Sequence, residues 1–498
     1  MRRSLAAAAV VAAVLAPAGA FLARSAGAKP ASPAGSIVAI SSSPALYPSF
    51  NPHVTDYVVR CGKKGLRLRV KATQPGAIKL DGRRVPDAKL DRRLRRRTGE
   101  AATIEAHRGG RDFTYHVRCL PLDFPSWTFR RSGAPQARWY LMTPESIVPR
   151  PSYVAIFDRN GVPVWWMHSN GSAINATLLP HDRIGWSVRK YEELSSQSRP
   201  FEVHALDGSR VGTIVAPDIL SDWHELRPLP NGDFFILGST RRDHVDLRPY
   251  GGPSDATVLD GVAEELTPTG RVVWSWSSRD HIPLSASSRW YFYIFKNSIR
   301  LPDGRRAYDL VHLNSVEPDG SKVVISSRHT DAVYGVDKAT GRVEWKLGGT
   351  PTAASLHMAD GTSSDRLFGG QHDVRVQPDG TLTVHDNRSL WDQAPRALRI
   401  RLELGRRQAR VVEHVSAPKL RSAFMGSARL LPGGDWVVSW GSTPRADEIA
   451  PSGKRILQFN FGFFYGTYRA VPILPGQLSA AALRAGMDAI ARRERRKR

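Results

Sequence analysis

The chain has 498 residues, a hydrophobic content of 41%, 13 tryptophans and a formal net charge of +25. This composition excludes an intrinsically disordered protein, and the length exceeds what one ordinary domain needs. The 71 lysines and arginines are spread over every segment among 46 acidic residues. We therefore expect no nucleic-acid partner and consider an anionic small substrate instead.

The N-terminus predicts export. Met1-Arg2-Arg3 is basic and precedes an apolar stretch from Leu5 to Ala23, with small residues before Ala28 that suit cleavage. We interpret residues 1–28 as a signal peptide and expect a periplasmic, cell-envelope or secreted location. An uncleaved single-span anchor is the alternative, because about 19 apolar residues can just cross a bilayer.

Residues 36–122 alternate short β-type runs with Gly/Pro turns, which predicts a small antiparallel β-sandwich. Cys61 and Cys119 are the only cysteines, and an oxidising compartment favours a disulfide between them. Two cysteines are too few for a thiolate metal site. The stretch from Ser43 to Val59 resembles the cadherin-like modules appended to exported bacterial enzymes.

From Trp127 to about Leu474 (residues 127–474), two types of hairpin alternate. One type carries Pro-x-Gly, and the other carries a glycine turn before a strand that often contains tryptophan. Their alternation predicts four-stranded sheets repeated at roughly 50 to 60 residues, which is typical of a β-propeller. A chain of about 350 residues then provides six blades, give or take one. A stacked β-helix is the second choice, but its repeats are usually much shorter.

Residues 478–498 change character. Apolar residues recur at helical intervals after Ser479, a candidate cap, so we expect a short C-terminal helix with a basic tail. The arginine-rich runs from Asp91 to Arg97 and from Arg492 to Arg498 read as solvated faces, and the tail suits association with an anionic envelope.

Three histidines share one register in the predicted repeat. Each lies eight residues before the glycine of an Asn-Gly or Asp-Gly turn, in which we expect positive φ at both turn positions. The pairs are His224 with Gly232, His312 with Gly320, and His372 with Gly380. Arranged around an axis, such units would bring the three imidazoles together.

Arginines follow the same register. Arg328 lies eight residues after its turn glycine, and Arg388 holds the same offset in the next unit. Three imidazoles with one or two guanidiniums suit an oxyanion, because arginine donates to such groups through a planar fork. The histidines that lack the register are interpreted as structural: His329, His204, His244 and His414.

Motifs for other kinds of catalytic chemistry are absent from this sequence or less well supported. His224-Glu225 does not continue into a second histidine, so the zinc motif His-Glu-x-x-His is absent, and no phosphate-binding glycine loop is present. Three histidines can still bind a metal, but a neighbouring guanidinium disfavours a cation. We therefore expect neither a metal nor another cofactor, and a metal-dependent propeller hydrolase remains an alternative.

At these residues the chain resembles the bacterial arylsulfotransferases, the arylsulfate sulfotransferase family that uses no nucleotide sulfate donor. The similarity is densest from Asp222 to Asn387. It is carried by Trp223-His224-Glu225, His312-Leu313-Asn314-Ser315-Val316, Ser326-Ser327-Arg328-His329, Trp345-Lys346-Leu347-Gly348-Gly349, Gln371-His372-Asp373 and Asp386-Asn387.

The resemblance implies a six-bladed propeller behind an N-terminal β-sandwich. It also implies that His372 is the nucleophile that becomes sulfated and that His224, His312 and Arg328 hold the sulfuryl oxygens. Asn314 and Arg388 complete the expected substrate-binding set. The reaction would move a sulfuryl group from an aryl sulfate donor to a phenolic acceptor through a sulfohistidine. A non-catalytic propeller that binds an anionic glycan or envelope ligand is the rival, and the oligomeric state, a homodimer included, stays open.

Overall fold

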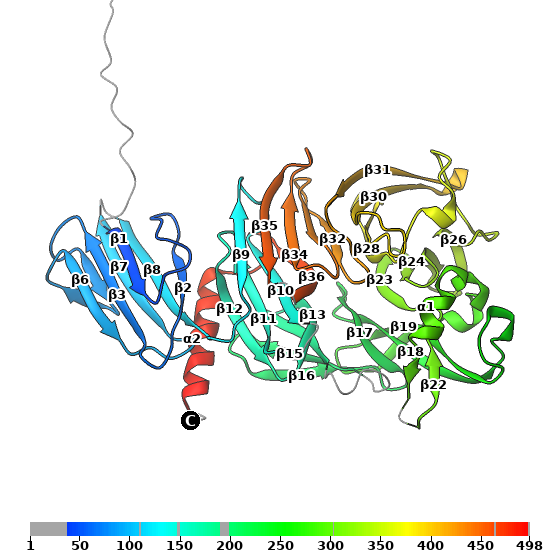
Figure 1. The fold of residues 1–498 in the computed structure, drawn as a ribbon, viewed down its shortest axis with the longest axis horizontal. Helices are drawn as coiled ribbons and strands as arrows, with labels where there is room; N and C mark the ends of the chain where they lie inside the picture. The colour runs from blue at the N-terminus through cyan, green and yellow to red at the C-terminus, as the bar shows by residue number, and fades with distance from the viewer. Residues whose placement is uncertain are drawn as a thin grey trace, which may run out of the picture.

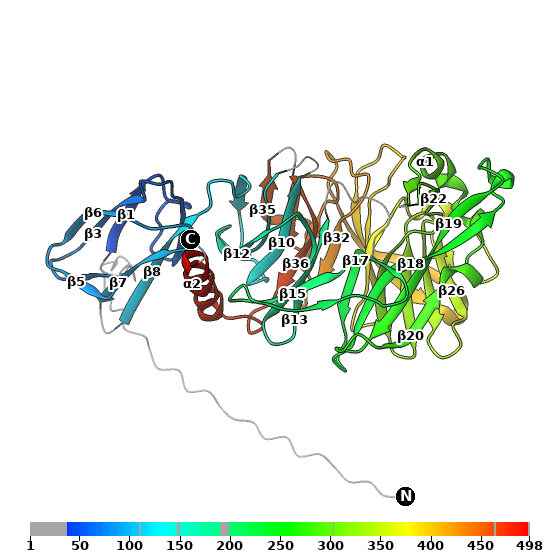
Figure 2. The same cartoon turned by 90° about the horizontal axis from the view of Figure 1, so that it is seen from below.

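The computed structural model describes residues 37–108, 111–146, 150–189, 199–301, 303–462 and 465–496. A small β-module lies at one end of the molecule and a larger ring of sheets at the other, with helix α2 (Ala480–Arg496) between them (Figures 1 and 2). The predicted signal peptide, residues 1–28, lies outside the described residues. Within those ranges, no helix is both long enough and apolar enough to span a membrane.

The N-terminal module is a sandwich of two sheets over one core. The sheets have the orders β1-β3-β6 and β2-β8-β7-β4-β5, and every pairing is antiparallel except that of β2 with β8. In β3, buried apolar residues alternate with exposed basic ones, as a strand with one solvated face requires. The strands are β1 (Ile37–Ser43), β2 (Asp56–Arg60), β3 (Leu66–Ala72), β4 (Ile78–Leu80), β5 (Arg83–Val85), β6 (Lys89–Leu94), β7 (Ala101–Arg108) and β8 (Arg111–Leu120).

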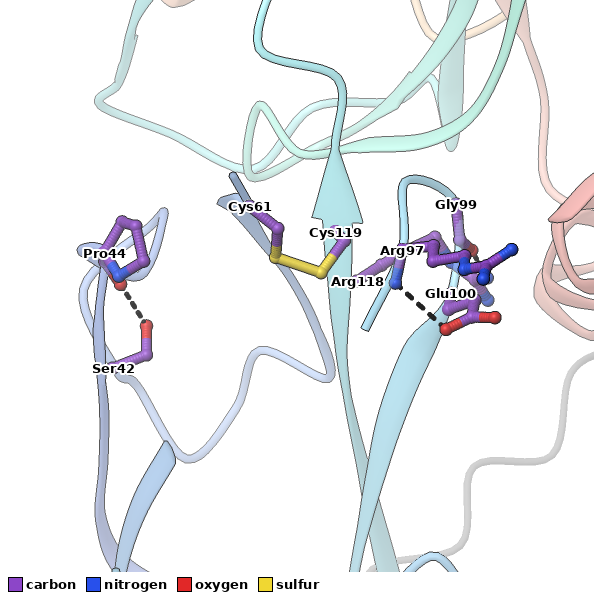
Figure 3. The surroundings of a disulfide bond; sticks show 8 residues. All are labelled: Ser42, Pro44, Cys61, Arg97, Gly99, Glu100, Arg118 and Cys119. Atoms are coloured by element: carbon purple, nitrogen blue, oxygen red, sulfur yellow. Dashed lines mark hydrogen bonds between the residues drawn. A yellow bond between two sulfur atoms is a disulfide. The ribbon is translucent and has the colours of Figure 1, made fainter. Parts of the chain in front are cut away.

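The predicted disulfide is confirmed. Cys61, directly after β2, is bonded to Cys119 in β8, with their Cα atoms 5.3 Å apart (Figure 3). It ties the two strands of the one parallel pair of the module together at their ends.

The ring contains six sheets of four or more strands within the described residues. Their orders are β12-β11-β10-β36, β13-β14-β15-β16, β17-β18-β19-β20 with β22 and β21 added at β19, β23-β24-β25-β26, β28-β29-β30-β31-β27, and β32-β33-β34-β35-β9. In chain order, the strands of the ring begin with β9 (Trp127–Arg131), β10 (Trp139–Ser146), β11 (Ser152–Asp158), β12 (Pro163–Ser169), β13 (Ser172–Leu179), β14 (Arg183–Arg189), β15 (Phe201–Ala205), β16 (Arg210–Ile214), β17 (Leu220–Pro228), β18 (Phe234–Val245), β19 (Ala256–Leu266) and β20 (Val272–Ser277).

The remaining strands are β21 (Ile299–Arg300), β22 (Arg306–Tyr308), β23 (Leu313–Asp319), β24 (Lys322–Ser327), β25 (Ala332–Asp337), β26 (Val343–Gly348), β27 (His357–Met358), β28 (His372–Val376), β29 (Leu382–Asp386), β30 (Arg396–Glu403), β31 (Gln408–Ser416), β32 (Ser427–Leu430), β33 (Trp436–Ser439), β34 (Arg445–Ile449), β35 (Arg455–Phe461) and β36 (Tyr465–Ile473). Short helical segments lie in the connections: η1 (Arg248–Tyr250), η2 (Ser278–Asp280), η3 (Leu284–Trp290), α1 (Tyr291–Lys296), η4 (Ser364–Arg366) and η5 (Leu404–Arg406).

The innermost strands close a ring. Strand β36 contacts β13, and contacts then run through β17, β23, β28 and β32 back to β36. The two ends of the domain share sheets, because β36 pairs with β10 and β9 pairs with β35. Pairing early strands with late ones joins the two ends of the domain and closes the ring. The predicted all-β class, with a propeller behind a sandwich and a C-terminal helix, is confirmed.

The turn geometry differs from the expectation. Gly232, Gly320 and Gly380 have positive φ, but the Asn or Asp before each of them does not. At Gly232, the amide of Leu229 donates to the carbonyl of Asp233, and the amide of Gly232 donates to the carbonyl of Leu229. This is a type I turn closed by a glycine at positive φ, which needs only one left-handed residue.

Buried charges from the innermost strands fill the centre of the ring. Arg375 on β28 bonds Glu225 on β17 at 2.8 Å and Glu317 on β23 at 3.1 Å. Arg469 on β36 bonds Glu225 at 2.6 Å, and its Nε lies 3.1 Å from Asp373 on β28. All five side chains are at least 95% buried.

Two further strands join this axial network, which we define as Asn175, Glu225, Glu317, Asp373, Arg375, Arg429 and Arg469. Arg429 on β32 bonds Asp373 at 2.6 Å, and Arg469 donates to Asn175 on β13 at 3.1 Å. Each innermost strand therefore contributes at least one member. Because removing one partner of a buried ion pair leaves an uncompensated charge, the network holds the six strands in one arrangement.

We expect Glu225→Gln to destabilise the fold in a pH-dependent manner. Burial alone would raise the pKa of Glu225, but the charges of Arg375 and Arg469 outweigh it and lower the pKa from 4.5 to about 2. The stabilisation by this carboxylate is then complete above about pH 4.5 and is lost as the pH falls through about 2. At neutral pH the variant should lose about 3–5 kcal/mol of unfolding free energy, and the difference from wild type should shrink in acid.

Urea unfolding followed by near-UV circular dichroism over a pH series measures this. The matched control is Glu344→Gln, which removes a carboxylate from an exposed pair with Lys322 and should unfold like the wild type. Equal behaviour of the two variants would contradict the role given to the axial network.

Candidate active site

The structure brings the predicted histidines together beside the axial network. The rings of His224 and His312 meet edge to face with centroids 4.6 Å apart. The ring of Tyr468 on β36 lies 6.1 Å from His224 and 6.5 Å from His372, and so links the third histidine to the first two. Arg469, next to Tyr468, donates to the backbone carbonyl of His224 at 2.9 Å.

His372 is the first residue of β28 and is 2% exposed. Its Nδ1 lies 3.2 Å from the carbonyl oxygen of Gly370 and 3.3 Å from the amide nitrogen of Asn387. The Asn387 amide already donates to the carbonyls of Gly370 and Met425, at 2.8 and 2.9 Å. Both of its hydrogens are therefore used, so Nδ1 of His372 carries the ring proton and donates it to Gly370.

This tautomer leaves the lone pair on Nε2 of His372 free, and Nε2 has no hydrogen-bond partner among the described residues. Burial, followed by the positive charges of Arg328 and of the neighbouring histidines, lowers the pKa of His372 well below 6.5. The ring is neutral at neutral pH, as a nucleophilic imidazole must be.

His312 is paired with a carboxylate. Its Nδ1 lies 2.5 Å from Asp309 Oδ2, and its backbone amide donates to Asp309 Oδ1 at 3.0 Å. Burial lowers the pKa of His312, and Asp309 opposes this effect. Burial would raise the pKa of Asp309, but His312 outweighs it and lowers that pKa to about 2. The ionised Asp309 fixes the tautomer and leaves Nε2 of His312 for proton transfer.

His312 also has a φ of 55°, in the left-handed region that non-glycine residues seldom adopt. Such strain persists where the surrounding structure imposes it, as at functional sites.

His224, within β17, has a looser carboxylate neighbour. Its Nδ1 lies 3.0 Å from Asp222 Oδ2, but this contact is not aligned as a hydrogen bond. The firm bond to Asp222 runs from the backbone amide of His224, at 2.7 Å.

Arg328 follows β24 and is buried without an acidic partner among the described residues. One Nη donates to Nε2 of His329 at 2.6 Å, and the other donates to the carbonyl of Ala423 at 2.9 Å. Its guanidinium carbon lies 4.2 Å from the ring centroid of Trp290 and 5.3 Å from that of Tyr293. Burial lowers the pKa of Arg328 to about 10, so the group stays charged at neutral pH.

Two predicted substrate-binding residues make other contacts in the described part of the chain. Asn314 is fully buried, and its amide donates to the carbonyl of Gln371 at 2.6 Å, so it supports the residue before His372. Arg388 shows no contact with the three histidines in the described part of the chain, and its guanidinium lies 6.0 Å from the ring of Trp391.

His329 was interpreted as structural, but the structure places it in the site. Its ring lies 4.7 Å from that of His312, and it holds Arg328 while its Nδ1 donates to the carbonyl of Asp309 at 2.6 Å. Tyr468 and Asp309 also lie in the site and were not predicted. The Asp-x-x-His spacing of Asp309 and His312 was an available signal, whereas Tyr468 comes from the last strand and carries none.

The same side chains were tested as a metal site. Asp309, His312 and His329 each place one potential ligand atom within 4.8 Å of the others. However, both nitrogens of His329 and Nδ1 of His312 are already hydrogen-bonded, and the guanidinium of Arg328 is one of the donors. A cation would have to displace these bonds and lie beside a positive charge, so the cluster favours an anion.

The arrangement therefore combines a neutral imidazole with a free lone pair, an unpaired buried guanidinium and an imidazole backed by a carboxylate. A group with anionic oxygens around an electrophilic centre fits this combination.

Comparison with known proteins agrees with this chemistry at the level of the family. A search of curated proteins found no match. Among solved structures, the chain is similar to a protein of unknown function from Bacteroides caccae, with 15% identity and a TM-score of 0.41 over 68% of this chain and 99% of that one. It is also similar to a catalytically inactive virginiamycin B lyase from Staphylococcus aureus, with 8% identity and a TM-score of 0.30 over 71% and 90% of the two chains. These distant likenesses carry no argument about function.

The family comparison is decisive. The model of the family described as arylsulfotransferase (ASST) matches residues 196–462, which include His224, His312, Arg328 and His372. Because this match covers more than half of the sequence, the chain belongs to the arylsulfotransferase family.

Proposed function

We propose that the protein transfers a sulfuryl group from an aryl sulfate ester to a phenolic acceptor through a sulfohistidine at His372. Membership of the arylsulfotransferase family supports sulfuryl transfer in general. The observation that carries the finer proposal is the neutral imidazole of His372, with Nε2 free, in the same cluster as the unpaired guanidinium of Arg328.

In the first half-reaction, Nε2 of His372 attacks the sulfur of the donor. The nitrogen–sulfur bond forms while the bond from sulfur to the aryl oxygen breaks. The departing phenolate takes a proton from the imidazolium form of His312, the minor form that the ionised Asp309 supports against the effect of burial. Arg328 and His224 stabilise negative charge on the non-bridging oxygens.

In the second half-reaction, His312 takes the proton of an incoming phenol. The phenol oxygen attacks sulfur, the nitrogen–sulfur bond breaks, and His372 returns to its neutral form. His372 is 2% exposed, so a sulfohistidine at this position would be shielded from bulk water, which slows its hydrolysis.

We also propose an exported, periplasmic or envelope-associated protein, since a disulfide persists in oxidising compartments. The domain limits proposed are 36–122 for the sandwich, 127–474 for the propeller and 478–498 for the helix and tail. Small-molecule substrates follow from the family.

The first test is release of 4-nitrophenol from its sulfate ester, with and without added phenol. Release should require the phenol and should yield phenyl sulfate in equal amount, measured by absorbance and mass spectrometry. Release into water alone would identify a sulfatase, and no release would support a protein that only binds anions; either result would refute the proposal.

The second test traps the intermediate. Intact-mass measurement after mixing with donor but no acceptor should show one added sulfuryl group on the wild type and none on His372→Asn. The matched control is His244→Asn, because the side chain of His244 is 73% exposed and belongs to no part of the site. An adduct that persists in His372→Asn would place the nucleophile elsewhere.

The third test examines Asp309 as the residue that orients His312. Phenyl sulfate releases a basic phenolate that needs a proton, whereas 4-nitrophenyl sulfate releases a stable anion. Asp309→Asn should therefore lower kcat by about 100-fold with phenyl sulfate and by about 10-fold or less with 4-nitrophenyl sulfate. Equal losses with both donors would show that Asp309 only supports the structure.

A further inference from the structure

Helix α2 is fixed between the sandwich and the propeller (Figures 1 and 2). Toward the sandwich, Arg484 bonds Asp56 at 2.6 Å, and Asp488 accepts from Arg118 at 2.7 Å. Toward the propeller, a Cβ added at Gly486 would lie 2.6 Å from the carbonyl oxygen of Leu206, so the two backbones are in direct contact. Helix α2 is therefore held rigidly against both the sandwich and the propeller.

A groove runs along this junction. It consists of two cavities of about 690 and 1170 Å³. The two cavities share the lining residues Lys63, Arg96, Arg97, Ala491 and Arg495, so they adjoin. None of these residues belongs to the active site described above.

The groove concentrates positive charge from both ends of the chain. Lys63, Arg95, Arg97, Arg492 and Arg495 line it, all are exposed, and within the described ranges none of them forms an ion pair. The acids of the smaller cavity do not pair with the side chains of these five residues: Asp488 pairs with Arg118, and Glu100 accepts from the backbone amide of Arg97. In the larger cavity, Asp207 pairs with Arg493. Like charges held together repel one another, and a bound anion relieves this repulsion.

The groove is also built before any ligand arrives. The disulfide at Cys61 holds the turn that carries Lys63 against β8, and the loop of Arg97, Gly99 and Glu100 lies beside it (Figure 3). A Cβ added at Gly99 would lie 3.2 Å from the Cβ of Ala491, so this loop packs closely on α2.

We propose that this groove binds a linear polymer that carries repeated phosphate groups. Guanidiniums pair with phosphate oxygens through two parallel hydrogen bonds, and a row of them suits a chain of such groups better than one small anion. A concave groove admits a chain, whereas a flat bilayer reaches only its rim. The smaller cavity has no Phe, Tyr or Trp in its lining, and Tyr153 and Trp166, which line the larger one, are each only 3% exposed, so nucleic-acid bases would find no open ring face to stack on. The proposal is independent of sulfuryl transfer.

The test measures binding of labelled inorganic polyphosphate of defined length to the full chain by fluorescence anisotropy at several salt concentrations. The groove variant is Arg95→Gln with Arg97→Gln, Arg492→Gln and Arg495→Gln. The matched control removes the same charge at four exposed propeller arginines: Arg271→Gln, Arg300→Gln, Arg342→Gln and Arg366→Gln. The groove variant should bind at least about 10-fold more weakly with a smaller salt dependence, and the control should stay within about twofold of wild type. Melting temperature and 4-nitrophenyl sulfate turnover report whether each variant is folded.

Four outcomes would overturn the proposal. If the wild-type protein does not bind polyphosphate, this class of ligand is excluded. If the groove variant and the control lose the same amount of polyphosphate affinity, binding reflects only the general positive charge of the protein. Tighter binding of heparin through the same arginines assigns the groove to a sulfated glycan. Groove-dependent binding to vesicles of anionic lipid that polyphosphate does not displace assigns it to a membrane.

Discussion

The buried ion network at the centre of the ring is the constraint on which the rest of the molecule depends. Arg375 and Arg469 each join carboxylates from different sheets, so these charges are satisfied only when β17, β23, β28 and β36 are all in place. The same strands carry the site: Glu225 follows His224 and Asp373 follows His372 in the sequence. A network that fixes these carboxylates therefore also fixes the backbone positions of the two histidines.

The site itself is organised around a buried charge that forms no ion pair with any acid in the described part of the chain. Burying an unpaired guanidinium is costly, and Arg328 keeps its charge through the rings of Trp290 and Tyr293 and the neutral nitrogen of His329. These neighbours stabilise the cation without cancelling its charge. The charge thus remains available to an anionic group and adds to burial, the larger cause, in lowering the pKa of His372.

The molecule separates two kinds of anion chemistry in space. The propeller centre holds a compact, buried cluster suited to one sulfuryl group, where Arg328 is fixed by hydrogen bonds. The junction of sandwich and α2 holds exposed, unpaired arginines along an open groove, where charge is spread out. The net charge of +25 shows only that the protein is basic; it does not distinguish the buried cluster or the open groove from a generally basic surface.

The sequence alone determined the β-propeller behind a sandwich, the disulfide and the convergence of His224 and His312, because turn glycines and strand alternation are local signals that set register. It failed where a side chain's role depends on a neighbour from another sheet. His329, for example, was set aside as structural although it holds Arg328. Tyr468 and the axial network come from strands far apart in the chain, and the two arginine runs meet only because α2 docks between the domains. Ring closure and helix docking decide these contacts, and no local pattern encodes them.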